Sequence, residues 1–304
     1  MNSKNAALYD EKSRRILSNK RILANVMKAV IPEYTDLSIS EIVNLIEDGS
    51  ESRLIKGMQN EDIRLDGAPI LYDIVFTSRL PGSDDEIGMI INVEEKVNPY
   101  PGYPLLSRAV YYLTRLFSKQ AGEITETGEY RKFKKVYTIW ICPTPPVYKR
   151  DSVKYIHFME DGFTGDFNEN LEEYDYLHIV MIYVGSKTDK KDKHQDIIEM
   201  FRLIFLDEET NSKNKTKILN ERYDIMLNEQ EVLDMPSYAE GFYQNGYREG
   251  MEQGLVQGLQ EGKLTTLIDN INSLMGSGMS FEEITSILKL DDDTINIVKQ
   301  KLNI

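Results

Sequence analysis

The chain has little of several features that identify common classes of protein. Its 304 residues include one cysteine, Cys142, which excludes a disulfide within the chain and fits the reducing cytoplasm. The first fifteen residues are polar and charged, unlike a signal peptide, and no apolar run approaches the ~20 residues that cross a bilayer. We therefore expect a cytoplasmic protein with no membrane contact.

Histidine is also scarce, and its positions do not suggest a site. His157, His178 and His194 lack the spacing of zinc ligands, and none is expected to form a Cys–His nucleophile with Cys142. No glycine-rich loop follows an expected strand in the way that a nucleotide-binding site requires.

Positive charge is in deficit, with 36 basic against 50 acidic residues and a net charge of −14 at pH 7. This balance argues against indiscriminate binding to nucleic acid, because phosphate contacts supply most of that affinity. Basic clusters nevertheless occur at residues 131–135 and 148–150. They are either solvated loop surface or an approach for a phosphate.

Two short apolar runs carry carboxylates where a buried strand is expected to have none. Asp73 lies within the run 70–76, and Glu94, Glu95 and Lys96 end the run 89–96. Residues 81–85, Pro-Gly-Ser-Asp-Asp, form a turn-prone cluster that would fold one strand back on the other.

Such a hairpin would bring the carboxylates together. Side chains alternate between faces along a strand, so Glu94 and Lys96 share one face while Glu95 points the other way. Asp73 would then lie beside Glu94 with Lys96 within reach. An aspartate in a strand or a Glu-Glu-Lys tripeptide alone indicates little, but this combination in an apolar setting predicts a divalent-metal site with an attendant lysine.

Periodicity predicts a mixed sheet flanked by helices, an α/β fold. Helices are expected at residues 12–31, 105–120, 195–206 and 216–229, and a further short helix, capped by Ser38 or Ser40, is expected to end at Leu45. Strands are expected at residues 53–56, 69–77, 88–96, 135–142, 153–158 and 176–184. The helix at 105–120 lies between two strands, so a right-handed crossover is expected to leave those strands parallel.

The composition changes near residue 236. Glycine recurs at every fourth position over 246–262, and each glycine costs a helix ~1 kcal/mol. A helix here would need close contact with another helix to offset this cost. Residues 236–263 are therefore either a flexible linker or a self-association helix. Residues 264–304 are expected to form a small helical module with helices at 264–275, 281–288 and 294–302. Ser280 and Glu283 predict a capping box, and Asp291 is a candidate cap for the last helix.

The acidic start of that last helix makes a DNA-reading helix-turn-helix less favourable than a dimerising or partner-binding module. The expected domain boundaries are therefore 1–235, 236–263 and 264–304.

The spacing of the acidic residues resembles the PD-(D/E)XK nuclease superfamily. Asp73 is followed about twenty residues later by Glu94-Glu95-Lys96 and then by a helix and a strand, although Tyr72 replaces the eponymous proline. Residues 91–96, 100–104 and 107–108, together with Asn60-Glu61-Asp62 and the glycine repeat, look like the Rpn-type recombination-promoting nucleases, a transposase-related branch. That branch often has glutamine where this chain has Lys96.

The resemblance implies a restriction-endonuclease-like core and Mg²⁺-dependent cleavage of DNA, with Mn²⁺ as a substitute metal. We expect the active form to be a homodimer or a larger assembly. Asp73 and Glu94 would hold the metal, the carbonyl of Glu95 could join them, and Lys96 would orient the attacking water. Recombination, transposition and defence against foreign DNA remain open as roles. The alternative is a catalytically degenerate nuclease fold that binds a partner.

A further acid often joins the metal in this superfamily. Glu61 is preferred here over Glu41 and Glu47, because Glu61 lies in the family-like segment before the first acidic strand. Tyr103, Arg108 and Gln120 flank the crossover helix, where they would either contact phosphate or pack at the ends of the helix.

Overall fold

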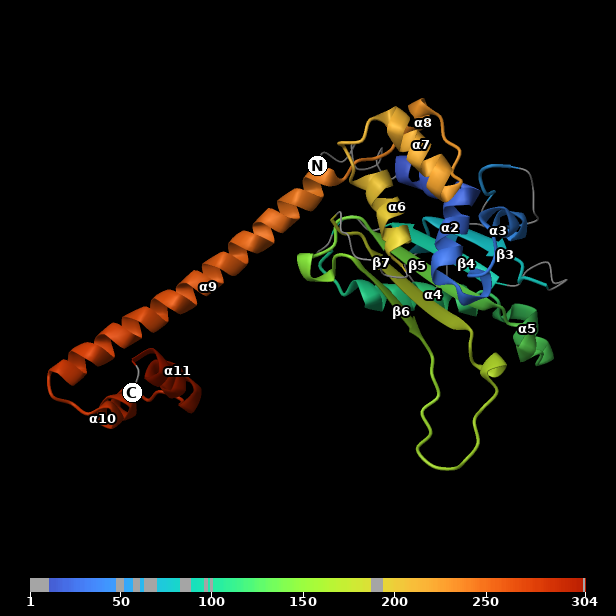
Figure 1. Cartoon of the computed structure of the whole chain (residues 1–304). Coiled ribbons are helices and arrows are strands. Elements are labelled where there is room, and N and C mark those ends of the chain that lie inside the picture. The colour runs from blue at the N-terminus through green and yellow to red at the C-terminus, as the bar shows by residue number, and fades with distance from the viewer. Residues whose placement is uncertain are drawn as a thin grey trace. The chain divides into compact units, whose positions relative to one another are not determined.

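The chain forms two compact units, residues Met1–Asn245 and Gly246–Ile304 (Figure 1). The computed structural model describes residues 11–47, 52–56, 61–62, 70–82, 89–95, 98, 101–186, 194–302 and 304. Within these ranges, none of the helices combines the length and the apolar character needed to cross a membrane.

A five-stranded mixed sheet forms the centre of the first unit. Its order is β3-β4-β5-β7-β6, with β3 Ile74–Ser78, β4 Met89–Glu95, β5 Lys135–Cys142, β7 Leu177–Tyr183 and β6 Ser152–His157. The three central strands are parallel, and β3 and β6 pair antiparallel at the edges. The expected mixed sheet and the parallel pair around the crossover helix are thus confirmed.

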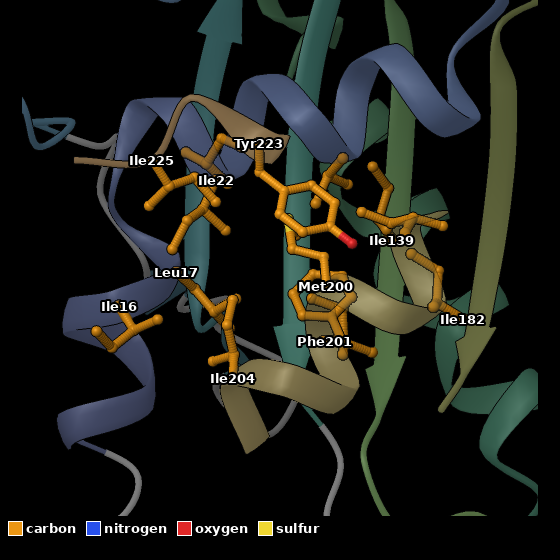
Figure 2. Close-up of a cluster of buried hydrophobic side chains, with 14 of the residues drawn as sticks. Ile16, Leu17, Ile22, Ile139, Ile182, Met200, Phe201, Ile204, Tyr223 and Ile225 are labelled. Atoms are coloured by element: carbon orange, nitrogen blue, oxygen red, sulfur yellow. The ribbon is translucent and has the colours of Figure 1, made fainter. Parts of the chain in front are cut away.

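One face of the sheet packs against helices from both ends of the unit. Tyr137, Ile139 and Ile141 of β5 point to this face and join side chains of α2 Lys20–Val30 and α6 Gln195–Phe205. Figure 2 shows Ile22, Phe201 and Ile204 of the helices and Ile139 and Ile182 of the strands as members of this one core. α7 Ser212–Tyr223 closes it through Leu219 and Tyr223.

The opposite face is covered by α4 Leu105–Ser118. Val136, Trp140 and Cys142 of β5 alternate with the residues above and pack here against α4, whose Ala109, Tyr112, Leu113 and Leu116 are buried. Because successive side chains of β5 point to opposite faces of the sheet, the strand contributes to two apolar cores.

Several expected elements differ from the structure. The helix expected over 216–229 is α7, which begins at Ser212 and ends at Tyr223, and residues 224–228 are not helical. The helix expected over 12–31 is interrupted, because Asn19 adopts an extended backbone, pairs with Leu54 in an isolated bridge and caps α2 through its side chain. Residues 53–56, expected as a strand, contribute only that bridge among the described residues.

The strand expected over 69–77 is divided. β2 Ile70–Leu71 pairs with β1 Glu61–Asp62 in a separate two-stranded sheet, while β3 begins at Ile74. Asp73 lies in the bend between β2 and β3, at the start of the larger sheet.

Short helices complete the first unit. They are α3 Ile39–Leu45, α5 Ala121–Thr127 and α8 Glu229–Leu233, with 3₁₀ turns at Pro32–Tyr34, Tyr130–Lys132, Val147–Lys149 and Leu171–Glu173. Ser38 caps α3 in a full capping box with Glu41, which confirms the helix expected to end at Leu45.

The second unit is helical, with α10 Phe281–Ile287 and α11 Asp292–Leu302 after the long α9 Ala239–Gly276. The Ser280–Glu283 capping box and the Asp291 cap are confirmed, since Ser280 Oγ accepts from Glu283 N–H and Asp291 Oδ1 accepts from Thr294 N–H. Residues 246–262 are helical, so the flexible-linker alternative is wrong, and 264–275 is the end of α9 and not a separate helix.

Candidate functional site

Asp73 lies just before β3, and Glu94 lies near the end of the neighbouring antiparallel strand β4. The register pairs Ile74 with Val93, so the positions that follow this pair are those of Asp73 and Glu94. The backbone N–H of Asp73 donates to Glu94 Oε1 at 3.1 Å. The hairpin expected from the sequence thus brings these two acids together.

Glu94 is a buried carboxylate on the face covered by α4. It is only 4% exposed and pairs in register with Trp140, whose side chain is part of that core. Asp73 keeps about a quarter of its side chain accessible, so a solvent path reaches the pair from its side. A buried acid beside a second acid is costly in an apolar setting unless it is paired or binds a metal.

Aromatic residues enclose the pair on the α4 side. The Tyr112 ring contacts the rings of Tyr72, at 5.3 Å between centroids, and Trp140, at 5.5 Å. Burial raises the pKa of the Tyr112 phenol; Arg108 opposes this rise, whereas the charges of Glu94 and Asp73 add to it. The phenol therefore stays protonated and can donate a hydrogen bond near the carboxylates at neutral pH.

One cationic side chain approaches the acids directly, and two others contact tyrosines around them. Arg14 Nε lies 3.8 Å from Asp73 Oδ1, and Lys119 Nζ lies 5.4 Å from the centre of the Tyr72 ring. The Arg108 guanidinium donates to the hydroxyls of both Tyr103 and Tyr112.

The pattern that revealed the two acids did not point to Arg14, Tyr112 or Lys119. Arg14 is remote in sequence from Asp73. Tyr112 occupies a position on α4 that helical periodicity assigns simply to the core.

Several other expected site residues have structural partners. Glu41 Oε2 accepts from Ser38 N–H and is committed to the α3 cap, and Glu47 Oε2 accepts from Lys56 N–H at 3.1 Å. Gln120 uses both ends of its amide on the backbone of Lys134, so its expected phosphate contact is replaced by a role in holding the start of β5.

The remaining expected residues fall outside what the structure describes. Lys96 lies outside the described residues, and so do the side chains of Glu61 and Glu95, although both residues belong to strands.

The basic clusters are partly engaged in ion pairs. Lys132 pairs with Glu129 at 2.5 Å and Arg131 with Glu173 at 3.2 Å, as expected for a solvated surface. Lys135 differs, because its Nζ bridges the carboxylates of Glu33 and Asp175 at the edge of the core.

Mg²⁺ takes oxygen ligands and is commonly held by one or two carboxylates together with waters and substrate phosphates. Asp73 and Glu94 supply two such carboxylates, and Glu94 Oε1 accepts from the Asp73 N–H. Among the described side chains, no three His, Cys, Asp or Glu residues group around a possible metal position.

Comparison of the chain with protein-family models, curated proteins and solved structures finds no match.

Proposed function

We propose that this protein is a Mg²⁺-dependent DNA endonuclease with a restriction-endonuclease-like core. The observation that carries the proposal is the contact between Asp73 and Glu94, which joins two acids at one end of an antiparallel strand pair. The Asp…Glu-x-Lys spacing, which resembles that of the PD-(D/E)XK nucleases, supports the same reading.

Asp73 and Glu94 would hold the cation. Three further roles are assigned from the sequence: the Glu95 carbonyl as a further metal ligand, Glu61 as a further acid, and Lys96 as the group that orients the water. A bound Mg²⁺ would polarise the phosphodiester and lower the pKa of a coordinated water. Arg14 and Lys119 would stabilise negative charge on the scissile phosphate.

The net negative charge argues against DNA binding, but this argument is weakened because most of the charge lies in two segments. Residues 158–176 carry seven acidic and no basic residues, and residues 246–304 carry nine acidic against five basic residues. These two segments account for −11 of the net −14. The acidic loop leaves the sheet beside Leu177, whereas Glu94 lies level with Met181, about 13 Å further along the strands.

Cleavage of supercoiled plasmid tests the proposal. The wild type should produce nicked or linear DNA with Mg²⁺ or Mn²⁺ and none with EDTA. Asp73→Asn and Glu94→Gln should each lower the rate by about 10²-fold or more, because each removes a ligand and leaves the shape of the side chain intact.

Matched controls separate ligand loss from a change in net charge. Asp161→Asn and Glu172→Gln remove one negative charge each from the exposed acidic loop and should leave the rate within about twofold. Equal activity of the wild type and both site variants would indicate a contaminating nuclease and refute the proposal.

One observation favours a second function, partner binding by a nuclease fold that has lost catalysis. The loop between β6 and β7 exposes Phe158, Met159, Phe163 and Phe167, and Phe163 is 96% accessible (Figure 1). Exposed apolar residues in a group often mark a protein-binding surface. Titration with Mg²⁺ and Mn²⁺ in a calorimeter distinguishes the two functions, because a degenerate site would give no binding heat.

A further inference from the structure

The loop between β6 and β7 carries charge and apolar side chains that the proposed nuclease site does not use. Figure 1 shows this loop, residues 158–176, extending beyond the end of the sheet. A group of its large apolar side chains is more than half exposed: Phe158, Met159, Phe163, Phe167 and Leu171. A contiguous apolar surface of this kind commonly marks a site where another molecule binds.

A pocket lies where the loop meets the body of the first unit. Its volume is about 430 Å³, within the range of about 300–1,000 Å³ found for ligand pockets. Phe117 of α4, Tyr176 and Leu177 line it from the folded body, and Phe158 and Met159 line it from the loop. An apolar group buried there would be stabilised by the hydrophobic effect.

The wall formed by the folded body is held in place by its own packing. The Phe117 ring stacks on Phe133 with 4.6 Å between centroids and lies 5.8 Å from the Tyr176 ring. Phe117 and Leu177 also pack against the core under α4. Because this wall is already ordered, an occupant does not have to order it on binding.

The loop wall is held by a contact between the two arms of the loop. The Glu169 N–H donates to Glu160 Oε2 at 3.0 Å, and both residues line the pocket. Asn170 Oδ1 accepts from the Glu172 N–H at 3.2 Å and caps the 3₁₀ turn that follows. The pocket therefore combines apolar walls with two exposed acidic side chains.

The charge around the pocket has one sign. The loop has seven acidic residues and no basic residue. Glu173 pairs with Arg131, and Asp175 pairs with Lys135. In the described part of the chain, the other acids of the loop form no ion pair: Glu160, Asp161, Asp166, Glu169 and Glu172. Their field attracts cationic partners and repels anionic ones.

We propose that this pocket binds a cationic segment of a partner protein, with a large apolar side chain in the pocket and lysine or arginine beside the loop carboxylates. Charge complementarity favours this occupant over DNA and over an anionic lipid surface. The apolar walls favour an apolar anchor over a simple cation. The binding is separate from cleavage and holds whether or not Asp73 and Glu94 cut DNA.

Selection of random dodecapeptides displayed on phage, with the full chain as bait, tests the proposal. Peptides enriched over a bait carrying both Phe158→Ser and Met159→Ser should contain a large apolar residue flanked by lysine or arginine. A labelled synthetic copy of such a peptide should bind the wild type with a Kd on the order of 1–100 μM in anisotropy titrations. Binding should weaken severalfold as NaCl rises from about 50 to 300 mM, because salt screens exposed charges.

Two substitutions test the walls of the pocket. Phe158→Ser and Met159→Ser should each weaken binding of the synthetic peptide by about tenfold, since each removes apolar contact area. Phe163→Ser changes an exposed side chain of the same loop outside the pocket and should leave the Kd within about twofold. Every variant should keep the wild-type midpoint in urea, because the altered side chains are exposed.

A double variant tests the charge. Glu160→Gln with Glu169→Gln keeps an acceptor for the Glu169 N–H but removes two charges, so it should weaken binding by about fivefold and reduce the dependence on salt. Glu209→Gln, at an exposed acid between α6 and α7, should leave the Kd within about twofold.

This test and the nuclease test fail independently. Asp73→Asn should bind the peptide as the wild type does, and Phe158→Ser should cut plasmid at the wild-type rate. A selection that enriches no peptide, or only uncharged or acidic ones, would overturn the proposal. So would equal affinities of the wild type and Phe158→Ser, because the peptide would then bind elsewhere.

Discussion

At the scale of single residues, Glu94 combines a structural and a functional demand. Its Oε1 atom accepts the Asp73 N–H inside an apolar core, and the same carboxylate is the proposed metal ligand. Glutamine keeps an oxygen acceptor in the same place but lacks the charge that a cation needs, so the two demands can be separated by substitution.

We predict that Glu94→Ala lowers the free energy of unfolding by about 1–3 kcal/mol, because a buried amide loses its acceptor. Glu94→Gln should lose clearly less, and both variants should be inactive on plasmid DNA. Urea titration in EDTA measures the stability. A glutamine variant that is less stable than the alanine variant would contradict the role given to the Asp73 contact.

His178 illustrates a buried titratable residue outside the site. Tyr155 Oη lies 2.8 Å from its Nδ1, its Nε2 faces the Asp175 backbone oxygen at 3.2 Å, and the Tyr137 ring stacks on it at 4.2 Å. Burial lowers the pKa of His178, while the Asp175 charge opposes the shift and Lys135 adds to it. Glu33, also nearby, acts in the same direction as Asp175.

Because the folded state holds the His178 pKa below its ordinary value of about 6.5, the unfolded state binds the proton more readily. Stability should therefore be fully present above pH 6.5 and fall as the pH drops through the folded pKa. Urea titrations at pH 7.5, 6 and 5 should show a shallower decline for His178→Asn. His157→Asn, at an exposed neighbouring position on β6, should keep the wild-type slope.

At the scale of the element, local sequence signals predicted where helices begin and end. They did not predict the interruption of a helix by a contact with a distant part of the chain. The boxes at Ser38 and Ser280 follow from a serine and a glutamate three residues apart. The break at Asn19 does not, because it depends on pairing with Leu54, which lies 35 positions later.

The acidic pair could be predicted because alternation and a turn signal sufficed to place Asp73 against Glu94. The approach of Arg14 and the backbone contacts of Gln120 depend on how whole elements pack, and no local pattern encodes that. The same limit explains why the division between β2 and β3 was not expected: the apolar run continues across it.

The cap of α2 provides a test at this scale. Asn19 is buried, and its Oδ1 accepts from Arg21 N–H at 2.9 Å. Asn19→Ala should lower the free energy of unfolding by about 1–2 kcal/mol, and Asn19→Ser should recover part of it, since serine is also a good cap. Equal losses for the two variants in urea titration would show that burial, and not capping, sets the cost.

At the scale of the whole molecule, the two units have separate cores of very different size. The first packs two layers of apolar residues around the sheet, whereas the second, Gly246–Ile304, has a core centred on Ile271, Phe281, Ile284 and Val298. A unit of this length buries a smaller fraction of its surface on folding than a larger domain does and is marginal by itself.

We therefore expect calorimetry to show two transitions, with enthalpies near 170 and 40 kcal/mol from about 0.7 kcal/mol per residue. Ile271→Ala should lower the temperature of the smaller transition alone, and Phe201→Ala that of the larger alone, because each deletes a side chain from one core. A single transition lowered by both core substitutions would mean that the units unfold together, and the separate stability argued for each core would then be wrong.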